Sequence, residues 1–438
     1  MSDERVIVSG GTIVDPASGP PRPGDLVIDG ERIAGIAPPG SVPAEGRVID
    51  ATGLLVLPGL VDMHVHLREP GHEYKETIAT GTAAAVAGGI TSVACMANTN
   101  PVNDSGAVTR FILEQAARAG AARVYPVGAL SVGLEGARLA EFGEMRRAGI
   151  VAVSDDGRPV MDAGLMRRAL EYARMFDLLV IAHEEDCGLA AGGVMNEGVT
   201  AVRLGLRGIP AAAEEVMVAR DIALAELTGG RLHIAHISTR GAVELVRAAK
   251  ARGVAVSAEA TPHHLLLTEE AVGEYDTNAK MAPPLRTQAD VDAVRAGLAD
   301  GTIEALATDH APHHRDEKEV EFEHAANGIV GLETSLALGL KLVAEGVLDL
   351  STLVDRMSTG PARLLGVPGG TLRPGEAADV TLLDPKRTWV VDPTAFRSKS
   401  RNTPYAGWEL TGKVVTVLVG GRTVYTDVTA QPVLRVAS

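Results

Sequence analysis

Residues 54–71 read LLVLPGLVDMHVHLREPG, an apolar run that ends in polar residues and a Pro-Gly turn. Such a pattern is typical of a buried strand with functional groups at its end. Side chains alternate between the two faces of a strand, so His64 and His66 point the same way and can hold one ion. Arg68 continues on the same face. Two hydrogen-bonded core histidines would give the same pattern, so this segment indicates a metal site but does not establish one.

The composition sets the class of protein. The chain has 438 residues, enough for one large domain and a smaller one, with 46% apolar and 22% charged residues, as in ordinary soluble globular proteins. A net charge of -15 argues against general nucleic-acid binding, which needs a basic face. A single local Arg can still bind an anionic substrate.

The sequence also predicts a cellular location. No apolar run approaches the ~20 residues that span a bilayer, and the first residues do not form a signal peptide. The two cysteines, Cys95 in an apolar run and Cys187 after an acidic segment, argue against a disulfide scaffold. We therefore expect a cytoplasmic protein with no membrane partner.

The two ends of the chain differ from its middle. Residues 1–57 and 367–438 are rich in short apolar runs bounded by Asp-Gly and Gly-Gly turns, and we expect them to form one small β-sandwich domain. Residues 58–366 alternate apolar runs with helical stretches such as 161–176, 211–227 and 241–252.

This middle part contains eight strand candidates. They lie at residues 61–67, 91–98, 124–130, 150–156, 179–184, 232–238, 254–263 and 303–310. Eight strands alternating with helices is the number in a closed (β/α)8 barrel of the TIM type, so we predict an α/β fold with that barrel over residues 58–366. A doubly wound open sheet is the alternative, because alternation alone does not show closure.

Metal-binding residue types recur where these strands end. They are His64, His66, Asp155, Asp156, His183, His233, His236, Asp309, His310, His313 and His314. In a barrel the carboxyl ends of the strands converge on one face, where enzymes of this architecture keep their active sites. The sequence therefore predicts a metal centre at that face.

Strand geometry reduces the number of candidates. His233 and His236 are separated by an odd number of residues and face opposite sides, and His236 lies nearer the strand end, so it is the better ligand. Asp155 and Asp156 also point in opposite directions, and the sequence does not choose between them.

The ligand types indicate which ions fit. Imidazole and carboxylate without thiolate favour Zn²⁺, with Mn²⁺, Co²⁺ or Fe²⁺ as alternatives. Four histidines and two aspartates are too many for one tetrahedral ion, and they suit two ions that share a carboxylate. Two ions ~3.5–4 Å apart can share a hydroxide and polarise a carbonyl.

Longer strings carry a family resemblance. They are PGLVDMHVHLREPG at 58–71, MANTNP at 96–101, SDDG at 154–157, ATPHH at 260–264 and ATDHAPH at 307–313. The chain resembles the amidohydrolase superfamily and, within it, the bacterial class I dihydroorotases. Hydantoinases, allantoinases and many dihydroorotases bridge their metals with a carboxylated lysine, but this chain has no lysine between Lys75 and Lys250.

The resemblance implies a binuclear centre with an aspartate as bridge. His64, His66 and Asp309 would bind one Zn²⁺, and His183 and His236 a second. Asp156 and a hydroxide would bridge the two ions. Asp309 would also be the catalytic residue, first as a base and then as an acid.

The resemblance also implies substrate contacts. They are His66, Arg68, Asn98, His313, Asn327 and Gly328, of which the last two lie on the charged loop 315–328, a candidate mobile lid. Ala282 departs from the family pattern, which has Asn at that position as a substrate contact. Asn278 lies four residues earlier, and we expect it to compensate.

The activity that the resemblance implies is that of a zinc-dependent dihydroorotase, which interconverts N-carbamoyl-L-aspartate and L-dihydroorotate in pyrimidine synthesis. A related cyclic-amide hydrolase of the hydantoinase or allantoinase kind is the first alternative. An inactive scaffold subunit is the second, and the full set of ligands argues against it. The sequence leaves open a homodimer or an assembly with aspartate carbamoyltransferase.

Overall fold

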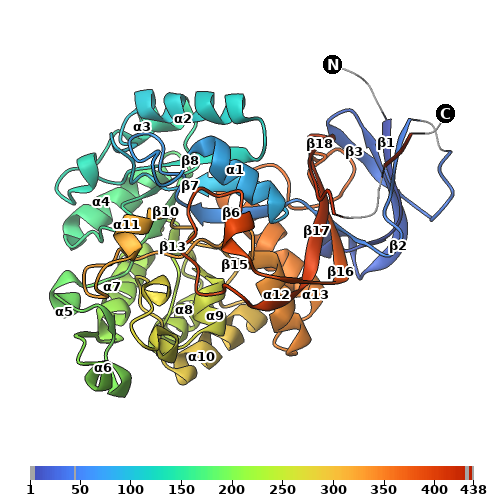
Figure 1. Ribbon diagram of the computed structural model, residues 1–438. Coiled ribbons are helices and arrows are strands. Elements are labelled where there is room, and N and C mark those ends of the chain that lie inside the picture. The colour runs from blue at the N-terminus through green and yellow to red at the C-terminus, as the bar shows by residue number, and fades with distance from the viewer. Residues whose placement is uncertain (1–4, 44–45, 430–433, 437–438) are drawn as a thin grey trace.

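The computed structural model describes residues 5–43, 46–429 and 434–436, which form a helix-covered barrel beside a β-sheet (Figure 1). The barrel strands are β6 Leu60–Val65, β7 Ile90–Cys95, β8 Arg123–Gly128, β9 Ala152–Ser154, β10 Leu179–Ala182, β13 Leu232–Ile234, β14 Val256–Ala260 and β15 Ala305–Leu306. All eight are parallel and lie side by side in chain order.

The barrel closes between its first and last strands. Val65, at the end of β6, forms a parallel bridge with His310, and the His66 amide donates to the His310 carbonyl at 2.9 Å. A sequential, closed order confirms the TIM-type barrel and excludes the doubly wound alternative. The strands are shorter than predicted: β15, for example, spans only Ala305–Leu306 of the predicted 303–310.

Helices cover the outside of the barrel. They include α1 Ile78–Ala87, α2 Gly106–Ala119, α3 Phe142–Ala148, α4 Ala163–Arg174, α7 Ala212–Thr228, α8 Arg240–Ala251, α10 Gln288–Asp300, α12 Ser335–Ala344, α13 Leu350–Val354 and α14 Gly360–Leu365. The Asp162 side chain caps α4 and the Thr239 side chain caps α8, which explains why both helices begin close to the predicted residues.

The carboxyl ends of the strands carry further short elements. These are α5 Cys187–Ala190, β11 Met195–Asn196, α6 Val199–Leu204, β12 Gly208–Ile209, α9 Pro262–Leu266 and α11 Arg315–Lys318. Cys95 is buried in the core and Cys187 is exposed, and both are free thiols.

Both ends of the chain meet in one sheet. Its strands are β1 Arg5–Ile13, β2 Arg22–Asp29, β3 Arg32–Ala37, β4 Arg47–Asp50, β5 Leu55–Pro58, β16 Val380–Val390, β17 Glu409–Val419, β18 Arg422–Thr426 and β19 Leu434–Val436. The order is β18-β17-β16-β5-β1-β2-β3, with β4 between β1 and β19. This sheet has its own apolar core, in which Val8 and Leu26 pack with Val380 and Leu418.

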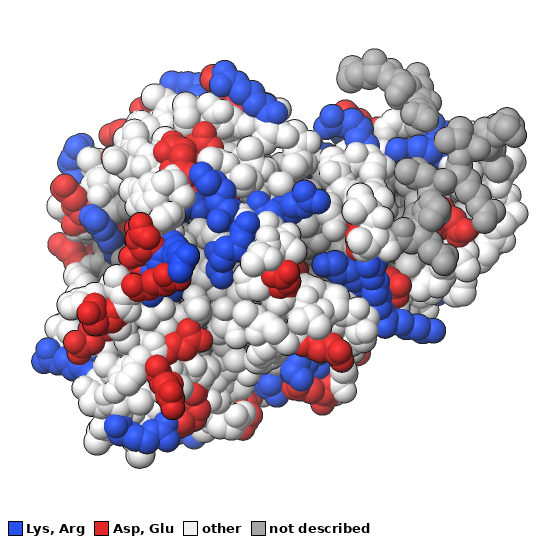
Figure 2. Space-filling view, in the orientation of Figure 1, with Lys and Arg blue, Asp and Glu red and all other residues white. Residues whose placement is uncertain are grey.

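Charge is unevenly distributed over the face in Figure 1. Figure 2 shows Lys and Arg side chains gathered beside α11 and over the orange-red chain segment next to it. Among the described residues, no helix combines the length and the apolar character that crossing a bilayer requires.

Candidate metal centre

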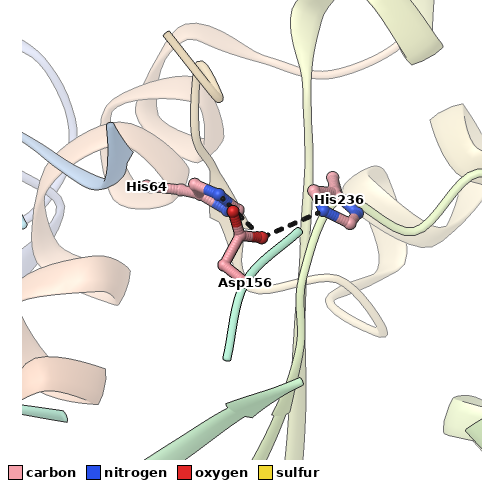
Figure 3. A group of neighbouring side chains, drawn as sticks. All are labelled: His64, Asp156 and His236. Atoms are coloured by element: carbon pink, nitrogen blue, oxygen red, sulfur yellow. Dashed lines mark ion pairs between the residues drawn. The ribbon is translucent and has the colours of Figure 1, made fainter. Parts of the chain in front are cut away.

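Four histidines surround Asp156 at the carboxyl ends of the barrel strands. The Asp156 Oδ1 atom lies 3.4 Å from His64 Nε2 and 3.6 Å from His236 Nε2 (Figure 3). The same oxygen lies 3.5 Å from His183 Nδ1. The other oxygen of Asp156, Oδ2, lies 3.4 Å from His66 Nε2. The four histidines follow or end β6, β10 and β13, and Asp156 follows β9, so the barrel register brings together residues that are far apart in the chain.

Asp309 completes the group from the loop after β15. Its Oδ1 atom lies 3.0 Å from His66 Nε2 and 3.5 Å from His64 Nε2. Two sets of three side chains have ligand atoms within 4.8 Å of one another: His64, Asp156 and His236, and His64, His66 and Asp309. Each set is compact enough for one ion, and His64 belongs to both.

The residues present fit a metal centre. His64 Nε2 and Asp156 Oδ1 are buried and have no hydrogen-bond partner among the described residues. Burying a polar atom without a partner is costly, and a cation between these two atoms would satisfy both. Imidazole and carboxylate are also the donors that Zn²⁺ and similar ions prefer.

The histidines of the centre stabilise the ionised forms of Asp156 and Asp309. Burial acts to raise the pKa of Asp156, but His64 and the neighbouring histidines outweigh it and hold the pKa well below its usual range. The pKa of Asp309 is also lowered against the effect of burial, chiefly by His64 and His66. Both carboxylates are therefore ionised at neutral pH and available as ligands.

A buried glutamate, Glu259, holds the His64 ring of this centre in place from within the barrel. Glu259, near the carboxyl end of β14, lies with Oε1 2.5 Å from His64 Nδ1 and with Oε2 3.2 Å from His233 Nε2. His233 also meets the Ser257 hydroxyl through Nδ1, at 2.8 Å. His233 thus points away from Asp156 and helps to hold Glu259, which fixes the ring of His64 with Nε2 toward the centre.

Sequence reasoning missed Glu259. A charged residue within the apolar run Val256-Ser257-Ala258-Glu259-Ala260 was the signal that could have found it, because unpaired carboxylates are rarely buried in strands.

The structure distinguishes the two adjacent aspartates. Asp155 points away from the histidines and accepts hydrogen bonds from the Leu130 amide at 2.8 Å, the Ser131 amide at 2.9 Å and the Ser131 hydroxyl. It therefore ties the ends of β8 and β9 together, while Asp156 faces the centre.

Three residues at the centre have an unusual backbone. Arg68, His236 and Asp309 have φ angles of 62°, 30° and 44°, in the left-handed region that L-residues with a side chain seldom adopt. Such strain persists only where the surroundings enforce it and is concentrated at functional sites.

A cavity of about 290 Å³ opens in front of these side chains. Of the predicted substrate contacts, His66, Arg68, Asn98, His313 and Asn327 line it, together with Ala282. The Asn98 side-chain oxygen lies 2.9 Å from His66 Nδ1. Arg68 donates through Nε to the Pro312 carbonyl at 3.2 Å, and its Nη2 lies 3.4 Å from His313 Nε2.

The pKa of His313 is lowered to about 3, first by burial and then by the positive charge of Arg68. The His313 ring is therefore neutral at physiological pH, and Arg68 is the fixed positive charge on the side of the cavity that these two residues line.

Two predicted substrate contacts do not line this cavity. Asn278 lies on a short 3-10 turn, Thr277–Ala279, and lines a neighbouring cavity instead. Gly328 lies behind His313: a Cβ atom there would come within 2.7 Å of the His313 ring and 2.6 Å of the Ala311 carbonyl oxygen. Only glycine leaves room for His313 in its present place.

Two buried lysines hold the segment 315–328. Lys280 donates from Nζ to the Phe322 carbonyl at 2.7 Å, and Lys318 donates from Nζ to the Ala326 carbonyl at 2.7 Å. Lys280 thus anchors the segment expected to be a lid to the rest of the protein, and the Lys318 bond braces the segment internally.

Asn402 connects the loops that carry His313 and Asn327, which form the wall of the cavity opposite the metal centre. Sequence reasoning missed this residue. It lies between β16 and β17, and its side-chain nitrogen donates to the carbonyls of Ala311 and Gly328 at 3.0 Å each. Its side-chain oxygen accepts from the His313 amide at 3.1 Å, and its own carbonyl accepts from the Val330 amide at 2.9 Å. The local sequence carries no signal for this role, because every partner is distant in the chain.

Comparison with known proteins places the chain among cyclic-amide hydrolases. The family model described as Dihydro-orotase-like matches residues 53–242. A dihydroorotase of Syntrophus aciditrophicus is 56% identical over 424 residues, which cover 97% of this chain and 100% of that protein. A dihydroorotase of Anaeromyxobacter sp. strain K is 57% identical over 429 residues, which cover 98% of this chain and 99% of that protein.

A solved structure shows the same architecture. The L-hydantoinase (dihydropyrimidinase) from Arthrobacter aurescens superposes with a TM-score of 0.86 at 27% identity, over 96% of each chain. The chain is thus more similar in sequence to the dihydroorotases than to this hydantoinase.

Proposed function

Because the chain belongs to the dihydroorotase family, whose members hydrolyse cyclic amides, we propose that it interconverts N-carbamoyl-L-aspartate and L-dihydroorotate in cytoplasmic pyrimidine biosynthesis. The observation that carries this proposal is Asp156 among four histidines, next to a cavity that Arg68 lines. With metal bound, the centre would supply hydrolytic chemistry, and the arginine suits a carboxylate-bearing ring.

Two ions, which we propose to be Zn²⁺, would be held by six side chains. These are His64, His66, Asp156, His183, His236 and Asp309. When bound, the pair supplies a Lewis acid and an activated nucleophile for amide hydrolysis. The two sets of compact ligand atoms that share His64, and the orphaned Asp156 Oδ1 atom, support this assignment.

Asp309 is the proposed proton carrier. It lines the cavity, and its lowered pKa keeps the carboxylate ionised and ready to accept a proton from the attacking water. The same carboxyl group would then return the proton to the leaving amide nitrogen of the ring. Its hydrogen bond with His66 Nε2 at 3.0 Å and its constrained backbone keep Oδ1 directed into the centre.

Arg68 is the proposed anchor of the substrate carboxylate. Its Nε donates to the Pro312 carbonyl and its Nη2 lies against His313 Nε2, so the guanidinium is held in place while its remaining N–H groups are available for a carboxylate. Asn98 and His313 lie on the same cavity and supply neutral polar contacts. Asn327 lines the same cavity and would help to enclose the bound substrate.

The decisive experiment compares wild type with Asp309→Asn in a dihydroorotate ring-opening assay, with metal content measured on the same samples. We expect the variant to keep most of its metal and to lose at least ~1,000-fold in kcat, because the proton carrier is missing. Undiminished turnover in the variant would remove Asp309 from the mechanism.

A substrate panel tests the identity of the reaction. Metal-replete wild type should open dihydroorotate at least ~100-fold more efficiently than an unsubstituted hydantoin, because the hydantoin leaves Arg68 without its carboxylate partner. Opening of hydantoins without opening of dihydroorotate would show that this chain is a hydantoinase-like enzyme instead.

A further inference from the structure

A second cavity lies beside the metal cavity, on the other side of His313. Its volume is about 310 Å³, large enough for a small metabolite, and His313 lines both cavities. Asn278 lines this second cavity, and so do residues of the segment between β16 and β17 that includes Asn402. None of the proposed metal ligands lines it.

The lining of this cavity is strongly basic. It contains four cationic side chains, those of Arg315, Lys318, Lys399 and Arg401, and one acidic side chain, that of Glu319. The whole chain carries a net charge of -15, so this concentration of positive charge is local. Figure 2 shows a group of Lys and Arg side chains near α11, the helix that carries Arg315 and Lys318.

Three of the four cations lack a counter-charge. Arg315 pairs with Glu319 at 2.5 Å. In the part of the chain that the structure describes, no carboxylate lies within 4.0 Å of the charged nitrogens of Lys318, Lys399 or Arg401. Glu73 contributes only its backbone carbonyl, which accepts from Lys399 Nζ at 2.6 Å.

These three cations keep free donors. Lys318 uses two N–H groups on the carbonyls of Ala326 and Gly328, and Arg401 uses its Nη1 on the carbonyls of Ser398 and Ser400. An ammonium group has three N–H donors and a guanidinium group has five. Each side chain therefore has at least one donor left for a ligand.

Of these three cations, Lys318 is buried, whereas Lys399 and Arg401 are exposed. Burial together with nearby Lys280 lowers the pKa of Lys318 to about 7, while Asp276 acts weakly in the opposite direction. Keeping an ammonium group buried without a counter-ion is unfavourable, and an anion in the cavity would remove that cost.

We propose that this second cavity binds a small molecule that carries two or more carboxylate or phosphate groups. The guanidinium of Arg401 suits two parallel hydrogen bonds to one anionic group, and the ammonium groups act as point charges for another. The ligand would lie next to His313 without entering the metal cavity. This binding site is independent of the reaction proposed above.

We expect an anion bound in the second cavity to weaken the binding of substrate in the metal cavity. His313 separates the two cavities and lies 3.4 Å from Arg68, so an anion bound on its far side partly neutralises the charge that holds the substrate. The expected result, which rests on the proposed function, is a higher KM for an anionic substrate with kcat unchanged.

Isothermal titration calorimetry of the full-length, metal-replete protein tests the binding directly. The probes are glutarate, as a dicarboxylate, and fructose 1,6-bisphosphate, as a bisphosphate. Wild type should bind at least one probe with a Kd below ~1 mM, and Lys399→Gln/Arg401→Gln should weaken that binding at least ~10-fold. The probe that binds identifies the anionic group.

A matched control removes the same charge elsewhere. Arg167→Gln/Arg240→Gln changes two exposed arginines that form only i,i+4 pairs on helices α4 and α8, and it should leave the Kd within ~2-fold. Thermal unfolding of both variants checks that each is folded. A crystal soaked with the bound probe should show density between Lys399 and Arg401.

Three outcomes would overturn the proposal. One is that neither probe binds below ~1 mM, and another is that Lys399→Gln/Arg401→Gln binds as wild type does. The third is that Arg68→Gln abolishes probe binding, which would place the probe in the metal cavity. Failure of the dihydroorotate assay would leave the calorimetric result intact, so the two proposals are separable.

Discussion

The metal centre and the wall of the cavity opposite it are built in different ways. Every histidine and aspartate of the centre lies at or just beyond the carboxyl end of a barrel strand. The wall consists of the loops that carry His313 and Asn327, and Asn402 reaches them from the segment between β16 and β17. The centre therefore depends on strand register, whereas the wall depends on hydrogen bonds between distant parts of the chain.

Because of this difference, we expect substitutions at the centre and in the wall to have different effects on metal content and on substrate binding. A change at the centre should remove ligands and therefore chemistry. A change in the wall should leave the metal in place and alter the binding of substrate. The following substitutions test that separation, from the largest expected effect to the smallest.

Asp156→Ala should have the largest effect. The side chain meets all four histidines, so its loss removes the ligand that the two proposed ions would share. We expect loss of most bound metal and a drop in kcat of ~1,000-fold or more, measured by elemental analysis and ring-opening assay. Asp155→Ala is the matched control and should keep its metal; equal metal loss in both variants would contradict the distinction between them.

Glu259→Gln should weaken the centre without removing a ligand. The amide cannot reproduce the charged contact with His64 and His233, so the orientation of the His64 ring is less well defined. Supporting residues of this kind typically change metal affinity by ~10–100-fold. Competition with a chelator measures the affinity, and full activity should return at high metal concentration. An affinity equal to that of wild type would show that the barrel alone orients His64.

Asn402→Ala should affect the wall alone. It leaves the Ala311 and Gly328 carbonyls and the His313 amide without their partner, so His313 and Asn327 lose their fixed positions. Unpaired buried groups of this kind cost about 1–3 kcal/mol each, and we expect KM to rise ~10-fold with metal content unchanged. Steady-state kinetics and elemental analysis on one preparation separate the two. Loss of metal in this variant would break the comparison.

Asn278→Ala should have the smallest effect. The side chain lies outside the metal cavity, so KM and kcat should both stay within ~2-fold of wild type. Steady-state kinetics under the conditions used for Asn402→Ala provide the measurement. A tenfold rise in KM would mean that Asn278 reaches the substrate and takes over the role of the asparagine that Ala282 replaces.

The sequence predicts the strand-built part of the molecule well. Neighbouring parallel strands bring their carboxyl ends to one face, so the apolar runs before His64, His183 and His236 were sufficient to place these residues together. The assembly of one sheet from both chain ends could also be predicted, because turns and alternating apolar runs are local signals.

The loop-built part could not be predicted in the same way. Asn278 is only four residues from Ala282, yet it faces another cavity because the short 3-10 turn at Thr277–Ala279 directs it away. Asn402 acts through partners about a fifth of the chain away. No local pattern encodes such contacts, since they arise only when the barrel and the segment after β16 pack together.

The closure of the barrel by a bridge between Val65 and His310 has a consequence for the order of events during biosynthesis. His66 and Asp309 are the neighbours of the two bridged residues. The first proposed ligands to be synthesised, His64 and His66, can therefore form a complete site only after the last barrel strand has been made. An amino-terminal fragment that stops before β15 would hold neither a complete ring nor a complete set of ligands. The complete set of proposed metal ligands can therefore come together only after β15 has joined the barrel sheet.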